Sequence, residues 1–134
     1  MYMPSPYTAL VRRFLRVLES GDYDQGGLTP ILAADAVLHV AAEGEGSVDY
    51  TDVEGVCGYL ARAREASGGT LEFKPQSFEL RDRGAFTVIT ASGRRGEDEF
   101  SETLKVVLGL AGGRVQELWI DPVDRESFER TFGA

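Results

Sequence analysis

The sequence predicts a single α+β domain, residues 1–134, in which helices come first and an antiparallel sheet comes last. Two features of the sequence lead to this prediction. The N-terminal part carries apolar residues at helical spacing, whereas the chain after Thr70 alternates apolar and polar residues between short polar or glycine-rich turns. Helices that precede such a run of hairpins pack on one face of the sheet. The chain is long enough to bury a core without disulfides.

Three helices are expected before the sheet. The first follows an apolar stripe and ends near Gly21. The stripe consists of Tyr7, Leu10, Val11, Phe14, Leu15 and Leu18. The second is a short helix within residues 28–36, with Thr29 as its N-cap and Pro30 as its first residue. The third spans residues 51–69 and ends at two glycines, and Cys57 lies on its apolar stripe as a small buried residue.

One strand is expected between the second and third helices, at residues 36–41, followed by a loop at 43–50. The later strands form an antiparallel meander. They are expected at residues 70–80, 84–92, 100–110 and 114–120. The acidic stretch "GEDEFSE" (96–102) is interpreted as a solvated hairpin end. A short helix at 124–132 closes the domain, with Asp124 as its N-cap.

The composition argues against several classes of function. A formal charge of −8 and an isoelectric point of about 4.6 argue against nucleic acid or an anionic membrane as a partner, because both repel an acidic protein. One cysteine excludes an internal disulfide, and no signal peptide or membrane-spanning stretch is found, so a cytoplasmic location is expected. One histidine and one cysteine do not make an ordinary metal site, and no phosphate-binding glycine loop is present, so no cofactor is expected.

The stretch "RVQELWIDP" (114–122) contains the only tryptophan. Period-two alternation puts Val115, Glu117, Trp119 and Asp121 on one side of the predicted strand. The opposite side carries Gln116, Leu118 and Ile120 and is apolar enough to join a core. A solvent-facing strand rarely has its only tryptophan among acids, and a core-facing strand rarely has two acids. The mixed face therefore indicates a pocket.

Three stretches resemble signature regions of the SnoaL-like polyketide cyclases, a branch of the nuclear transport factor 2-like superfamily. They are "DAVLHVA" (35–41), "VDYTDVEGVCGYLARA" (48–63) and "GGRVQELWIDPVDRESF" (112–128). The resemblance implies a sheet curled into a cone around a pocket, with the three N-terminal helices packed on its concave face. It also implies a histidine in the first strand and an aromatic-x-Asp-Pro end to the last strand, which His39 and Trp119 to Pro122 match. The chain departs from the family at Asp52, where a glycine is usual.

The resemblance and the strand pattern together give candidate site residues. Asp121 and His39 are the candidate catalytic pair. Asp124 competes with Asp121, but Asp121 shares the Trp119 face, and Asp124 has a structural role as a helix cap. The candidate substrate-binding residues are Trp119, Glu117, Tyr50 and Tyr59. The structural alternatives are a turn at Asp121, a half-buried histidine with a backbone partner, and packing of Tyr59 on the third helix.

Two hypotheses of function follow. A carboxyl group in an apolar pocket holds or exchanges a proton near neutral pH, so the chain would be a cofactor-free acid–base enzyme. Its reaction would be cyclisation or epoxide opening of a polyketide-like molecule, as in the resembling cyclases. The alternative is a non-catalytic domain of the same fold that binds a small hydrophobic ligand or forms dimers. Burial of Asp121 beside His39 around a cavity would favour the enzyme, and an acid in solvent or a cavity filled by side chains would favour the alternative.

The expected partners are a small hydrophobic molecule and a second copy of the chain. The strands around Phe86 and Val88, and the strand "LKVVLGL" (104–110), are apolar on both faces. Because helices cover only one face of the sheet, the other would leave an apolar surface in water. A homodimer through that face is therefore expected.

Overall fold

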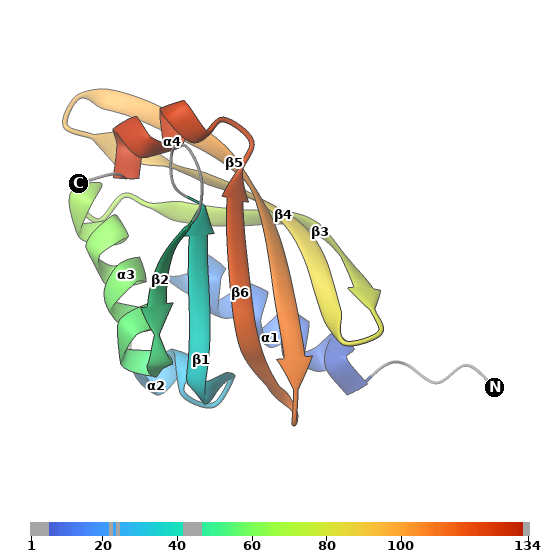
Figure 1. The fold of residues 1–134 in the computed structure, drawn as a ribbon. Coiled ribbons are helices and arrows are strands. Elements are labelled where there is room, and N and C mark those ends of the chain that lie inside the picture. The colour runs from blue at the N-terminus through green and yellow to red at the C-terminus, as the bar shows by residue number, and fades with distance from the viewer. Residues whose placement is uncertain (1–5, 22, 24, 42–46, 133–134) are drawn as a thin grey trace.

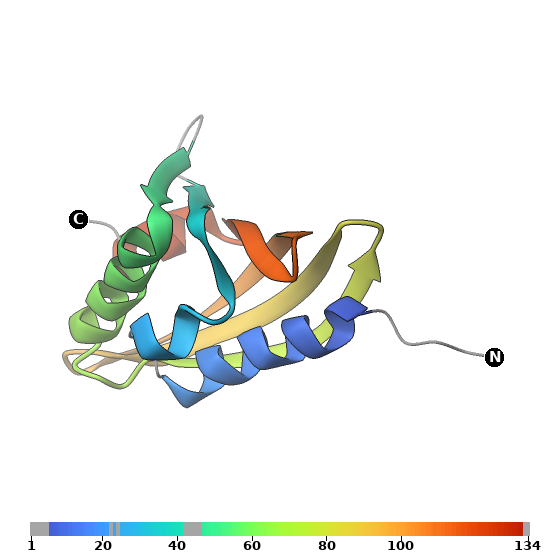
Figure 2. The same cartoon turned by 90° about the horizontal axis from the view of Figure 1, so that it is seen from below.

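A strongly curved sheet forms the body of the protein, and its concave side holds the longer helices (Figures 1 and 2). The structure is a computed structural model, and it describes residues 6–21, 23, 25–41 and 47–132. The helices of this part are α1 (Pro6–Ser20), α2 (Gln25–Leu28), α3 (Asp52–Ala66) and α4 (Arg125–Phe132). The strands are β1 (Leu32–Ala41), β2 (Ser47–Thr51), β3 (Glu72–Arg81), β4 (Gly84–Arg95), β5 (Asp98–Ala111) and β6 (Arg114–Pro122). The α+β class is confirmed.

The sheet has the strand order β2-β1-β6-β5-β4-β3. Strands β3 to β6 form the predicted antiparallel meander. Strand β1 pairs antiparallel with β2 but parallel with β6, so the sheet is not purely antiparallel. The parallel pair brings the first long strand of the chain beside the last one. It thereby sets His39 opposite Trp119.

The prediction of a second helix at residues 28–36 was wrong. The only helical turn described in this region is the four-residue α2, which ends at Leu28, and β1 already begins at Leu32. Leu32, Ala36, Leu38 and Val40 are buried in β1. Pairing of β1 with β6 therefore outweighs the local helix-start signal of Thr29 and Pro30.

The loop predicted at residues 43–50 was wrong in its second half. Ser47–Thr51 forms β2, the edge strand that pairs with β1, and residues 42–46 lie outside the described residues. Helix α3 then begins at Asp52, the position where the family resemblance leads us to expect glycine. Asp52 has a φ of 59°, in the left-handed region that glycine favours, and its carboxylate accepts a 2.8 Å hydrogen bond from the Gly55 amide.

The core lies between the sheet and helices α1 and α3. The predicted stripe of α1 supplies five of its buried residues: Leu10, Val11, Phe14, Leu15 and Leu18. Cys57 is buried in α3, as predicted. Alternate residues of β5 complete this core from the sheet side, and their neighbours face outward. None of the helices in the described residues is long and apolar enough to span a membrane.

Candidate functional site

The predicted site face of β6 lies on the outside of the sheet. Leu38, Leu118 and Ile120 point into the core and line a cavity there. Because successive strand residues point to opposite faces, His39, Glu117, Trp119 and Asp121 point outward. The expectation that these residues line the inside of the cone is therefore wrong. Val115 shares their parity yet is fully buried, because the register shifts between β5 and β6 at this point.

On this outer face the sequence candidates do meet. His39 Nδ1 lies 2.8 Å from Asp49 Oδ1, and His39 Nε2 lies 2.9 Å from Glu117 Oε2. The imidazole also stacks on Trp119, with ring centroids 5.3 Å apart. Asp49 was not among the predicted site residues. The His39–Asp49 pairing depends on β2, which was read from the sequence as a loop.

The two carboxylates determine the charge of His39. The hydrogen bond to Glu117 raises the pKa of the imidazole above its ordinary value of 6.5, and the hydrogen bond and charge of Asp49 act in the same direction. Partial burial lowers the pKa, by less than the Glu117 hydrogen bond raises it. Both ring nitrogens donate only in the imidazolium form, so the geometry favours a charged His39. The charged imidazole of His39 is thus held between Asp49 of β2 and Glu117 of β6.

Asp121 has a surface environment. Its carboxylate accepts a hydrogen bond from Arg125 at 3.1 Å, and its side chain is 45% exposed. It therefore lacks the burial that the acid–base hypothesis required. Asp124, the competing acid, accepts a 3.0 Å hydrogen bond from the Ser127 amide at the start of α4, which confirms its predicted role as an N-cap.

Tyr50 and Tyr59 lie together on the other side of the sheet. Their ring centroids are 4.7 Å apart, and the Arg62 guanidinium lies 5.7 Å from the Tyr50 ring centroid. Tyr59 also lines a small cavity under α4, whereas Tyr50 packs at the edge of the core. Neither residue belongs to the His39 cluster. The structure thus divides the predicted site residues between the two faces of the sheet.

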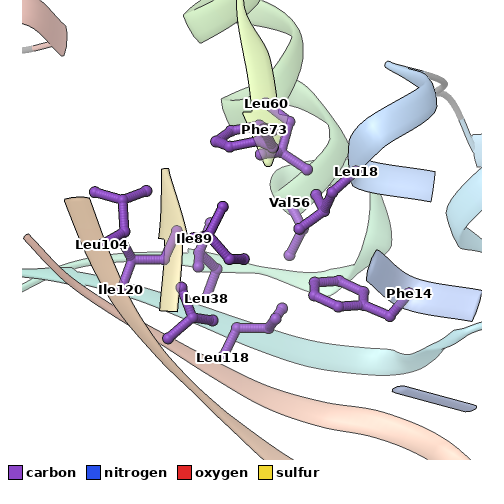
Figure 3. Close-up of a pocket in the computed structure, with 11 residues that line it drawn as sticks. Phe14, Leu18, Leu38, Val56, Leu60, Phe73, Ile89, Leu104, Leu118 and Ile120 are labelled. Atoms are coloured by element: carbon purple, nitrogen blue, oxygen red, sulfur yellow. The ribbon is translucent and has the colours of Figure 1, made fainter. Parts of the chain in front are cut away.

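A cavity of about 30 Å³ lies inside the cone (Figure 3). Its lining comes from α1, α3 and all strands except β2, and it contains no polar residue. The lining residues are Phe14, Leu18, Leu38, Val56, Leu60, Phe73, Ile89, Leu104, Val106, Leu118 and Ile120. A void in the centre of a core departs from the close packing that is usual in proteins. An apolar lining of this kind keeps water out and accepts apolar groups.

A second cavity of about 10 Å³ lies beside the first, under α4. The two share Phe73, Leu104 and Ile120 as walls. Glu102 does not itself line this cavity, but it is the register partner of Ala91, which does. Glu102 is only 4% exposed, and it is the one carboxylate among the described residues that is buried.

The interpretation of "GEDEFSE" as a solvated hairpin end was therefore wrong at its last residue. Glu102 has the same parity as Leu104, Val106 and Leu108, so the alternation of β5 could have placed it on the inner face. No group of three or more His, Cys, Asp or Glu side chains in the described part of the chain is arranged to hold a metal ion.

Comparison with solved structures gives the fold. Bal32a, from a soil-derived mobile gene cassette, superposes with a TM-score of 0.84 at 19% identity, over 95% of this chain and 96% of its own. A protein from Jannaschia sp. CCS1, provisionally named a SnoaL-like polyketide cyclase, superposes with a TM-score of 0.77 at 14% identity, over 100% and 99% of the two chains. The chain has the SnoaL-like fold. The family resemblance seen in the sequence is thus confirmed for the fold.

A third neighbour, TerC, was co-crystallised with polyporic acid. It superposes with a TM-score of 0.77 at 14% identity, over 97% of this chain and 100% of its own. No protein-family model matches the sequence, and no curated protein matches it either. At such low identities the SnoaL-like neighbours inform the fold alone.

Proposed function

We propose that this SnoaL-like chain binds a small hydrophobic molecule inside the cone, without proton transfer by Asp121 or His39. The single observation that carries the proposal is the central void with its wholly apolar lining. Apolar groups gain free energy by entering such a site, whereas water finds no hydrogen-bond partner there. Names of neighbours add support, because one was crystallised with polyporic acid and another is provisionally named a polyketide cyclase.

The size of the void sets a condition on binding. About 30 Å³ is far less than the roughly 150 Å³ cavity that admits benzene in a well-studied engineered core. A ligand therefore enters only if lining side chains move. Binding would follow an opening of the core, and the affinity would be reduced by the cost of that opening.

An acid–base enzyme built on Asp121 and His39 has less support. Asp121 is half exposed and paired with Arg125, and His39 lies between two carboxylates on the outer face. Neither residue is among those that line the central cavity. A buried Asp121 would have favoured the enzyme, whereas the exposed Asp121 favours the non-catalytic alternative.

The test is a calorimetric titration with 1-methoxynaphthalene, an uncharged aromatic probe. Val56→Phe puts a ring into the cavity and should abolish binding, whereas Val48→Phe, at an exposed site of β2, should leave it unchanged. Circular dichroism checks that both variants fold, and Val56→Ile, a smaller filling, should weaken binding only partly. If the wild-type protein does not bind the probe, or if Val56→Phe binds as the wild type does, the proposal is wrong.

We also propose that the chain forms a homodimer through the outer face of the sheet. An apolar patch, the outer patch, consists of Phe86, Val88, Val107 and Trp119. Phe86, Val107 and Trp119 lie in one row across β4, β5 and β6. Val107 is 41% exposed and Trp119 is 39% exposed in the single chain. A second copy with the same patch would cover this surface in a closed two-fold dimer.

Sedimentation at about tens of micromolar protein tests the dimer, since a sizeable apolar interface binds well below that concentration. Val107→Lys puts a charge in the outer patch and should give a monomer. Val123→Lys, at a site that is 61% exposed outside the sheet, should sediment as the wild type does. A monomeric wild-type protein would exclude the dimer.

A further inference from the structure

Glu102 is an acidic residue at a position where the fold would accept an apolar one. The inner row of β5 is otherwise apolar, with Leu104, Val106, Leu108 and Leu110 all buried. Placing a carboxyl group in that row costs free energy unless hydrogen bonds compensate it. No basic side chain of the described residues forms an ion pair with Glu102. Its recorded partners are two hydroxyl groups of α4.

Both partners contact the same oxygen. The Ser127 hydroxyl donates to Glu102 Oε1 at 2.5 Å, and the Thr131 hydroxyl lies 3.3 Å from that oxygen. The Thr131 hydroxyl is closer, at 3.0 Å, to the Ser127 carbonyl, which can take its single hydrogen instead. Among the described residues no donor is recorded for Oε2. The described residues leave no buried side-chain oxygen without a partner, so Oε2 reaches solvent and can accept a hydrogen bond from water or from a ligand.

The covering helix depends on its docking to the sheet. Helix α4 has eight residues, too few to be stable in isolation, so its docking maintains it. Its buried side carries Ser127 and Thr131 toward Glu102, and Phe128 and Phe132 beside the smaller cavity. At the C-terminal end of α4, Arg95 donates to the carbonyl groups of Arg130 and Thr131. Outward movement of α4 would remove two aromatic side chains from the wall of the smaller cavity.

We propose that Glu102 is the polar end of the ligand site, and that the ligand is an aromatic molecule with a hydroxyl group. Its ring system would occupy the two adjoining cavities after α4 moves outward, and its hydroxyl would donate to Glu102 Oε2. The two cavities adjoin because Phe73, Leu104 and Ile120 line both of them, and movement of these side chains would join them. This inference rests on the proposed binding of a hydrophobic molecule and adds the chemical class of that molecule.

Two probes of the same apolar body test it, 1-naphthol and 1-methoxynaphthalene, which lacks the donor. In a calorimetric titration the wild-type protein should bind 1-naphthol about tenfold more tightly, since hydrogen bonds to charged groups are of that order. Glu102→Leu should bind both probes equally. Glu102→Gln, which keeps shape and an acceptor, should retain a preference of about threefold, as a neutral hydrogen bond is weaker. Glu99→Leu, at an exposed site of the same strand, should keep the tenfold preference.

The outcomes separate this inference from the proposed function. If the wild-type protein binds both probes equally, or if Glu102→Gln and Glu102→Leu both keep the tenfold preference, Glu102 does not contact the ligand and the inference is wrong. The proposed function would still stand in that case if the wild-type protein binds both probes and Val56→Phe abolishes this binding. If neither probe binds the wild-type protein, the proposed function and this inference both fail.

Discussion

The two faces of the sheet differ in a way that the residue types alone do not suggest. The outer face carries the histidine, the tryptophan and most of the acids that suggested catalysis. There His39 lies between Asp49 and Glu117 and stacks on Trp119. Asp121 is half exposed and pairs with Arg125. The inner face carries aliphatic side chains and one buried carboxyl group, Glu102. A polar cluster on a strand therefore indicates a pocket only when it faces the core.

The largest effect that separates the two faces is expected on β5. Leu108 is fully buried and its neighbour Val107 is exposed on the other face. Leu108→Ala should lower the free energy of unfolding by about 2–5 kcal/mol, because it leaves a cavity. Val107→Ala should change the stability of the monomer by about 0.5 kcal/mol or less. Urea unfolding measures both, and similar losses would contradict the assignment of the faces.

A smaller effect is expected where α4 begins. Asp124→Ala removes the hydrogen bond to the Ser127 amide and should lower the free energy of unfolding by about 1 kcal/mol. Loss of the cap should loosen α4, so in this variant the rate of amide hydrogen exchange should rise more in α4 than in β5. Equal protection in the wild type and the variant would show that the cap does not hold the helix. Glu126→Gln, at an exposed site of the same helix, is the control.

On the outer face, the His39 cluster predicts a pH dependence. The pKa of His39 is raised in the folded protein, mainly by the hydrogen bond to Glu117, so its stabilising effect is complete below the ordinary value of 6.5. The effect is lost as the pH rises through the raised pKa. Partly exposed partners limit it to about 0.5–1 kcal/mol. Urea unfolding of the wild type and of His39→Gln at about pH 5.5 and pH 9 measures the difference. If the difference in the free energy of unfolding between the wild type and His39→Gln is as large at about pH 9 as at about pH 5.5, this interpretation is wrong.

The smallest effect is expected at Asp121, which the sequence analysis assigned to proton transfer. Asp121→Asn weakens one exposed ion pair with Arg125 and should change the free energy of unfolding by less than about 0.5 kcal/mol. The affinity for 1-methoxynaphthalene should stay the same. A large loss of binding in this variant would return Asp121 to the site and reverse the comparison of the faces.

Long periodic segments could be predicted from the sequence, and tertiary pairings could not. The stripe of α1 and the alternation of β3 to β6 were enough to give the α+β class. Residues 28–36 carry a helix-start signal, yet Leu32 onward forms β1, because its residues pair with β6 about 80 positions later. The edge strand β2 alternates only Val48 and Tyr50 with polar residues, a pattern too short to be recognised, and it depends on β1 in the same way.

The candidate site was predicted in part for the same reason. The grouping of Glu117 and Trp119 on one face follows from parity, and His39 joins them through the pairing of β1 with β6. Which face turned inward was the part that parity alone did not decide, although Leu118 and Ile120 were already recognised as suited to a core. Glu102 was overlooked because it was grouped with the acidic residues of the hairpin end at 96–102, although the predicted strand 100–110 already included it.

The parallel pairing of β1 with β6 fixes the order in which the domain can assemble. His39 and Glu117 are 78 positions apart, so the sheet stays open at its centre until the last strand has left the ribosome. Before then the nascent chain holds two separate pieces, the β1–β2 hairpin and the meander from β3 to β5. Their inner faces remain uncovered, and each piece presents an unpaired edge strand to other chains. A nascent chain stopped before β6 would therefore be prone to aggregation.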